Sequence, residues 1–288
     1  MKTKALIAAS LFALGAVTTA HAGNFQNLTT NFIDAGGDAY ADPMYILITS
    51  TTYVAGYDDV TLYDEYDPAT LSLGNVVPSS ITYRAFDNYD PTTPTGAGTL
   101  TLLDWRVTKG VDLAPGSAQA DIYDFVYRDS SDNSLVFGTR YLNRVENNEE
   151  VNFLYRYGFT GYSTSVAWTY ITNSDLGQYT AVKTESTSGE GPFDYSEDVV
   201  RQQGDFSVTE GQPWSGLFLV KTDATSYVLG KAIGFFQSGE EGQDPAGGFI
   251  QGFVPTTAVP EPESYALFIA GLGVLGVVSR RRNSKIAK

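Results

Sequence analysis

Ile122-Tyr123-Asp124-Phe125-Val126-Tyr127 and Phe153-Leu154-Tyr155-Arg156-Tyr157-Gly158-Phe159 are the stretches that decide the fold of this chain. In both, aromatic residues recur at every second position. Because successive side chains of a β-strand point to opposite faces of a sheet, this period of two predicts strands. We expect the four aromatic residues of the second stretch to share one face, with Leu154, Arg156 and Gly158 on the other.

Similar short runs recur through the body of the chain, separated by Gly, Asp, Asn and Pro, and no long amphipathic helix pattern interrupts them. This organisation is typical of an all-β domain, and we expect an antiparallel β-sandwich with a jelly-roll-like arrangement. Residues 87–98 and 185–198 have the composition of loops. The predicted strands are 44–54, 60–63, 81–86, 100–107, 122–127, 135–142, 151–159, 165–172, 179–183, 206–209, 217–220, 226–236 and 248–254.

The first 22 residues have the features of a secretory signal peptide, expected to form a short helix. Lys2 and Lys4 precede an apolar run over residues 5–17, and Ala20-His21-Ala22 is a small-x-small cleavage site with Ala20 and Ala22 as its small residues. We therefore expect the Sec machinery to export the chain and signal peptidase to cut it before Gly23. The β-sandwich body then occupies residues 23–255.

Composition excludes several classes of function. The chain has a formal net charge of −15, which opposes binding to nucleic acid or to an anionic membrane. It contains no cysteine, and its one histidine, His21, lies in the predicted signal peptide. The mature body therefore lacks the residues for thiol catalysis, a Ser-His-Asp triad or a histidine-bound zinc ion. We accordingly expect a protein that is not an enzyme.

The C-terminal end has three parts: a Pro-rich linker at 256–264, an apolar segment at 265–279 and a basic tail at 280–288. The uncharged core of this segment, 265–278, has 14 residues and would be roughly 21 Å long as a helix at 1.5 Å per residue. A transmembrane helix needs about 20 residues, so the segment is short, although flanking side chains extend its reach. Its basic end is expected to stay in the cytoplasm, which places the body outside.

The order of these parts resembles the PEP-CTERM sorting tail of exported proteins of Gram-negative bacteria. The resemblance rests on Pro260, Glu261 and Pro262, then the apolar segment, then Arg280, Arg281 and Arg282. It implies recognition of the Pro-Glu-Pro motif by exosortase, a membrane transpeptidase that removes the tail, and the arginines as the membrane stop. It also implies an association with exopolysaccharide and biofilm. About 30 residues carry the resemblance, so it concerns sorting and not the activity of the body.

Acidic turns offer one candidate metal site. Asp129, Asp132 and Asn133 lie in Asp129-Ser-Ser-Asp-Asn-Ser134, which has the residue types that bind calcium. The stretch lacks the spaced Asp pattern and the distal Glu of an EF-hand loop. Polar turns of this kind also form for backbone reasons alone. We therefore expect no cofactor, with a structural calcium ion as the alternative.

Aromatic and acidic residues offer two further candidates. Trp105, Trp168 and Trp214 could stack on sugar rings, although large aromatic residues also build sandwich cores. Pairs of carboxylates, such as Asp104 with Glu146 or Asp124 with Glu197, could serve a glycosidase, but no local motif selects one pair.

We therefore expect a non-enzymatic surface or matrix protein, delivered to the cell surface or secreted, that associates with extracellular polysaccharide. The alternatives are a carbohydrate-binding module, a carboxylate-dependent polysaccharide-active enzyme and a self-associating matrix scaffold. A binding module predicts a concave or flat strip of exposed aromatic residues, and a scaffold predicts an exposed sheet edge or apolar patch.

Overall fold

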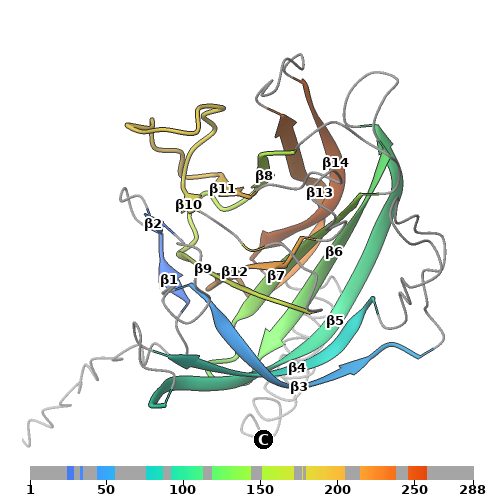
Figure 1. The fold of residues 1–288 in the computed structure, drawn as a ribbon, viewed down its shortest axis with the longest axis vertical. Coiled ribbons are helices and arrows are strands. Elements are labelled where there is room, and N and C mark those ends of the chain that lie inside the picture. Colours follow the sequence, from blue (N-terminus) through green and yellow to red (C-terminus); the bar gives the residue numbers. More distant parts are fainter. Residues whose placement is uncertain are drawn as a thin grey trace, which may run out of the picture.

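The computed structural model describes residues 25–28, 33–34, 44–55, 76–86, 92–112, 119–143, 151–171, 177, 180–204, 215–237 and 246–257. These segments form antiparallel β-sheets (Figure 1), which confirms the all-β prediction. The predicted signal peptide and C-terminal segment lie outside the described residues. Within the described ones, no helix is long and apolar enough to span a membrane.

Two sheets make up the part of the body that the structure describes. The first has eight strands in the order β1-β9-β12-β7-β6-β5-β4-β3, and the second has six in the order β14-β13-β8-β11-β10-β2. The strands of the first sheet are β1 (Gln26–Asn27), β3 (Ile46–Tyr53), β4 (Pro78–Phe86), β5 (Pro94–Asp112), β6 (Gln119–Asp129), β7 (Leu135–Asn143), β9 (Thr164–Thr169) and β12 (Leu217–Thr222). Those of the second are β2 (Ile33–Asp34), β8 (Phe153–Arg156), β10 (Thr180–Val182), β11 (Val200–Gln203), β13 (Ser226–Gln237) and β14 (Ala246–Thr256).

The eight-stranded sheet is strongly curled. β3 to β7 follow one another as neighbours, so this part is a meander, which the jelly-roll-like prediction did not include. Near the edge strand β3, Tyr45 forms an isolated bridge with Trp168 of β9, and the Trp168 amide donates to the Met44 carbonyl at 2.9 Å. The two ends of the sheet therefore approach each other, and its long strands bend around an interior (Figure 1).

Strand β6 separates two hydrophobic cores. Tyr123, Phe125 and Tyr127 share one face, as predicted, and pack in the core on the inner side of the curled sheet with residues such as Tyr83. The alternating Ile122 and Val126 pack in the other core, between the two sheets, together with residues of β8 and β13. Both faces of β6 are buried, which explains why aliphatic and aromatic residues occupy both of them between Ile122 and Tyr127, with Asp124 as the one charged residue in that stretch.

A buried ion pair crosses between the sheets at Asp124. The Arg156 guanidinium of β8 donates to the Asp124 carboxylate at 2.8 Å, and the Phe253 amide of β14 donates to it at 2.6 Å. Both charged side chains are 1% exposed. Burial raises the pKa of Asp124, while Arg156 and the Phe253 amide oppose that rise. One charged residue on each central strand therefore ties the two sheets together.

The predicted alternation of aromatic residues on one face of the stretch 153–159 holds for residues 153–157 and fails at Phe159. Phe153, Tyr155 and Tyr157 lie on the outer face of the six-stranded sheet, with ring centroids 6.3 Å apart for each successive pair. The backbone of Gly158 has φ of +97°, which ends the alternation. Phe159 is consequently turned into the core between the sheets, where it makes an edge contact with Phe137.

Other boundaries differ modestly from the prediction. Residues 94–98 were expected in a loop but begin β5, which runs on to Asp112 with register shifts at 102–104 and 108–111. Bulges of this kind accommodate a long bent strand. The segment 185–198 is a loop, as predicted, between β10 and β11. The predicted strands at 60–63 and 206–209 lie outside the described residues.

Candidate functional site

An aromatic cavity opens on the outer face of the six-stranded sheet. It has a volume of about 350 Å³ and is lined by β8, β13, β14 and the loop 185–198. This volume is at the small end of the usual range for ligand pockets, about 300–1,000 Å³. The lining residues are Tyr155, Tyr157, Glu185, Thr187, Gly234, Phe235, Phe236, Ala246, Gly247, Gly248 and Phe249.

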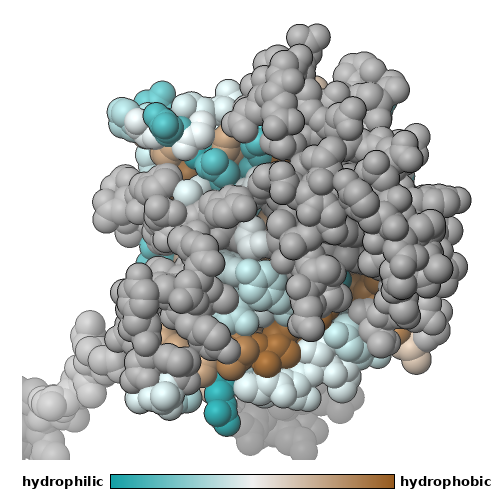
Figure 2. Space-filling view, in the orientation of Figure 1, coloured by the Kyte–Doolittle hydropathy of each residue, from teal (hydrophilic) through white to brown (hydrophobic). Residues whose placement is uncertain are grey.

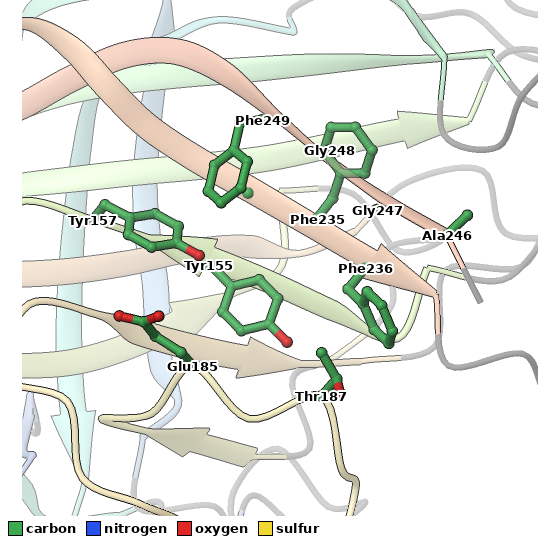
Figure 3. Close-up of a pocket in the computed structure, with 11 residues that line it drawn as sticks. Tyr155, Tyr157, Glu185, Thr187, Phe235, Phe236, Ala246, Gly247, Gly248 and Phe249 are labelled. Atoms are coloured by element: carbon green, nitrogen blue, oxygen red, sulfur yellow. The ribbon is translucent and has the colours of Figure 1, made fainter.

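Rings form the base of the cavity. Figure 3 shows Tyr157, Tyr155 and Phe236 in a row, with Phe249 on one side and Glu185 and Thr187 on the other. The centroids of Tyr157 and Phe249 are 5.1 Å apart. Phe249 is 50% exposed, so its ring is accessible to a ligand.

Glycines on β13 and β14 allow these rings to approach. A Cβ atom at Gly234 would lie 3.1 Å from ring atoms of both Phe249 and Tyr157, so a side chain there would push these rings apart. At Gly248 a Cβ atom would lie 2.5 Å from the Phe235 ring. Glycine inside a strand marks such a close approach.

The wall of the cavity formed by the loop 185–198 is held in place by Arg201 of β11. Its guanidinium lies between the rings of Phe153 and Phe193, 4.5 and 4.4 Å from their centroids, and donates to the Ser186 carbonyl at 2.8 Å. The Tyr155 hydroxyl donates to the same carbonyl at 3.0 Å. These contacts fix the backbone between Glu185 and Thr187, so the wall of the cavity is ordered before any ligand arrives.

The one charged residue among the described residues that line the cavity is negative. Burial raises the pKa of Tyr157 to about 12, with further contributions from the negative charges of Glu185 and Asp198. The loop that carries them is hydrophilic, as Figure 2 shows at the upper left. Of the described residues that line the cavity, one is a carboxylate, Glu185, and none is a lysine or an arginine.

The candidate calcium residues lie in the hairpin turn between β6 and β7. The Lys221 ammonium contacts the carboxylates of both Asp129 and Asp132, at 2.8 and 2.7 Å. Asp129 also accepts a hydrogen bond from the Tyr83 hydroxyl at 2.7 Å, and Asn133 adopts φ of +64° in the turn. Among the described residues, no cluster of three or more His, Cys, Asp or Glu could hold a metal ion. The calcium hypothesis stays a prediction, although a lysine supplies positive charge where a cation would lie.

The other candidates do not converge on the cavity. Trp168 is 2% exposed and packs against Tyr45 and Tyr170 in the core, so it cannot stack on a sugar. Trp105 is half-buried against the inner core. Asp124, suggested as a carboxylate partner of Glu197, is buried with Arg156 and does not line the cavity. Trp214, Glu146, the cleavage-site residues Ala20 and Ala22, Pro260 to Pro262 and Arg280 to Arg282 lie outside the described residues.

Sequence reasoning identified Tyr155 and Tyr157 as part of an aromatic face but missed Phe249 and Glu185. Phe249 follows Gly247-Gly248 inside a strand, and that pair of glycines is the signal that could have indicated a close approach of rings. Glu185 has no comparable signal, because a loop glutamate looks the same whether or not a cavity lies beside it.

Comparison with known proteins gives one match. Residues 258–282 match the family model of the PEP-CTERM protein-sorting motif, which confirms the resemblance inferred from the C-terminal residues. Such a motif marks an exported protein processed by exosortase, a membrane transpeptidase. The matched segment begins just after β14 ends at Thr256, so it does not include the cavity. No curated protein and no solved structure matches the chain.

Proposed function

We propose that this exported exosortase substrate is a non-enzymatic polysaccharide-binding protein of the cell surface or extracellular matrix, associated with exopolysaccharide or biofilm. The aromatic cavity binds a sugar unit of that polysaccharide. The observation that carries the proposal is the pair of accessible rings, the part-buried Tyr157 and the half-exposed Phe249, above a base formed by the buried Tyr155 and by Phe236 (Figure 3).

The chemistry of the cavity fits a sugar. Pyranose rings present apolar C–H faces, which pack on aromatic rings, and hydroxyl groups at their edges. Tyr157 and Phe249 supply the aromatic surface, while Glu185 and Thr187 at the opposite rim supply a carboxylate and a hydroxyl for hydrogen bonds. Ligand pockets commonly combine apolar walls with a few polar groups in this way.

The carboxylates favour binding over hydrolysis. A glycosidase needs two carboxyl groups about 5–9.5 Å apart across the scissile bond. Among the described residues lining the cavity, Glu185 is the single carboxylate, and Asp124 is engaged in the ion pair between the sheets. Incubation with polysaccharides should therefore release no new reducing ends, and a steady release would contradict the non-enzymatic part of the proposal.

The binding test uses the full-length chain in detergent and immobilised polysaccharides. Tyr157→Ala and Phe249→Ala should each weaken retention by about 3- to 10-fold, the effect of losing one aromatic stacking contact. Tyr195→Ala is the matched control, since Tyr195 is a 51% exposed aromatic residue on the loop 185–198 that does not line the cavity. Equal retention of all three variants and the parent would refute the cavity as the binding site.

The topology is part of the proposal. An N-terminal signal peptide and a C-terminal transmembrane helix with cytoplasmic arginines both place the body outside the inner membrane. Removal of the tail then leaves the body at the surface or releases it. Replacing Pro260 and Pro262 by Ala should leave the full-length chain in the membrane fraction. Processing and release at the parental rate would show that these prolines are not needed for sorting.

A self-associating scaffold is the second candidate, favoured by the exposed end of the β13–β14 hairpin. Val228 and Leu229 of β13 are 52% and 59% exposed, and β14 is an edge strand. Unpaired edges with exposed apolar residues are prone to pair with other chains. Light scattering of the full-length chain should then show concentration-dependent oligomers that Leu229→Lys reduces. A monomer at all concentrations would eliminate this candidate.

A further inference from the structure

We propose that the cavity selects sugars that carry a positive charge, namely polysaccharides containing free amino sugars, over neutral or acidic ones. The inference rests on the proposed polysaccharide binding and specifies the ligand of the same cavity. It follows from the charges around the rings, from the rings themselves and from the position of one lysine.

The carboxylate that lines the cavity disfavours anions. Its single described lining charge is the carboxylate of Glu185, which lies on an exposed part of the loop and faces the same side of the row of rings as Thr187 (Figure 3). The same loop contributes Asp198, whose carboxylate lies close enough to act on Tyr157. A uronic acid placed over Tyr157 would meet these negative charges, whereas an ammonium group would be attracted to them.

The rings also favour cations. The faces of aromatic rings carry partial negative charge and attract an ammonium group within about 6 Å of the centroid. Four aromatic side chains, Tyr155, Tyr157, Phe236 and Phe249, line one small cavity. A sugar with an ammonium substituent can stack its C–H face on one ring and direct its charge toward another.

One lysine of the chain, Lys231, already makes such a contact between an ammonium group and these rings. The Lys231 ammonium lies 3.6 Å from the centroid of Phe249 and 5.9 Å from that of Tyr157. Lys231 is exposed, so its side chain can move away when another cation arrives. We therefore expect Lys231 to compete with the amino group of the ligand for the face of Phe249.

The experiment compares three tetrasaccharides of equal length: a glucosamine tetramer, its fully N-acetylated counterpart and a galacturonic acid tetramer. Affinities for the full-length chain in detergent are measured calorimetrically at low and high salt. The glucosamine tetramer should bind about two- to five-fold more tightly than the acetylated one, the contribution of an exposed ion pair. This preference should shrink at high salt, because salt screens exposed charges.

Two variants and a control assign the preference to the cavity. Glu185→Gln should abolish the preference, and Lys231→Met should strengthen binding of the glucosamine tetramer. Glu190→Gln is the matched control, because Glu190 is an exposed carboxylate on the same loop that does not line the cavity. It should bind like the parent.

The outcomes separate this inference from the proposed function. Binding of all three tetramers with equal affinity, tighter binding of an acetylated or acidic tetramer, or a preference retained in Glu185→Gln would overturn the charge selectivity and leave polysaccharide binding intact. Failure of the parent to bind any polysaccharide or tetramer would overturn both.

Discussion

Replacement of Asp124 by Asn removes the negative charge that Arg156 meets between the two sheets. The side chain keeps its shape, so the variant tests charge and hydrogen bonding without creating a cavity. In the parent protein, Asp124 accepts hydrogen bonds from Arg156 at 2.8 Å and from the Phe253 amide at 2.6 Å. An asparagine has one acceptor oxygen, so its amino group would face one of these two donors.

The size of the expected loss of stability follows from the burial of Arg156. Arg156 is 1% exposed, and its remaining partners are the Gly138 and Phe253 carbonyls and the Thr139 hydroxyl, at 3.0, 2.9 and 2.6 Å. These accept hydrogen bonds but carry no net charge. Removing one member of a buried ion pair typically costs about 3–5 kcal/mol. For a denaturant dependence near 2 kcal/mol/M, the urea midpoint should fall by about 2 M.

A double-mutant cycle makes the test specific. Arg156→Met should cost a similar amount, because it leaves the Asp124 carboxylate buried beside one amide donor. The double variant Asp124→Asn with Arg156→Met should be more stable than the sum of the two single losses by about 2–3 kcal/mol. Urea unfolding of the purified chain, followed by tryptophan fluorescence, measures all four proteins. Additive losses, or an Asp124→Asn protein within about 0.5 kcal/mol of the parent, would refute the role of this pair.

Three further predictions concern other parts of the body. Lys221→Met leaves the buried Asp129 carboxylate without its ammonium partner and should lower the free energy of unfolding by about 3–5 kcal/mol. The control is Lys231→Met, which should change the free energy of unfolding by less than about 0.5 kcal/mol because Lys231 is exposed. Equal effects of the two variants would contradict this prediction. Gly161→Ala should cost about 1 kcal/mol from its left-handed backbone alone, and Gly158→Ala more, since its Cβ atom would lie 2.9 Å from Val254; the reverse order in thermal unfolding would refute the packing argument. Above pH 10, the free energy of unfolding should fall by up to about 4 kcal/mol per pH unit, about 1.4 for each buried phenol. Stability falls as the pH rises because burial raises the pKa values of these phenols in the folded chain, so the unfolded chain loses its phenol protons first. Urea midpoints at pH 9 to 11 measure this loss of stability, and a midpoint that does not change with pH would contradict the prediction. The phenols are those of Tyr83, Tyr127 and Tyr141.

The fold class could be predicted from the sequence because strand formation depends on a local pattern. The alternation in residues 122–127 and 153–157 sorts side chains to two faces wherever the strands are placed. The same logic explains the error at Phe159: a single left-handed glycine at position 158 reverses the face, and the sequence does not state the φ angle of a glycine. The predicted loop at 185–198 was also correct, since Ser, Gly and Glu disfavour strands.

The candidate site could be predicted only in part. Trp168 had the residue type expected of a sugar platform, but it lies in the core between the sheets. Tyr157 and Phe249 are 92 positions apart in the chain and meet because β13 lies between β8 and β14. The residue type of an aromatic side chain does not distinguish a core position from a ligand contact, because the same ring serves both purposes.

The sequence by itself determined how this protein is sorted and the class of its fold. A sorting signal is a linear motif, and residues 258–282 carry it without reference to any other part of the chain. The tertiary structure alone decided that Asp124 is engaged in an ion pair between the sheets, that Lys221 neutralises the acidic turn at Asp129, and that Phe249 and Glu185 share a cavity with Tyr157. These are contacts between distant residues, and only the packing of the sheets fixes which side chains meet and which are removed from water.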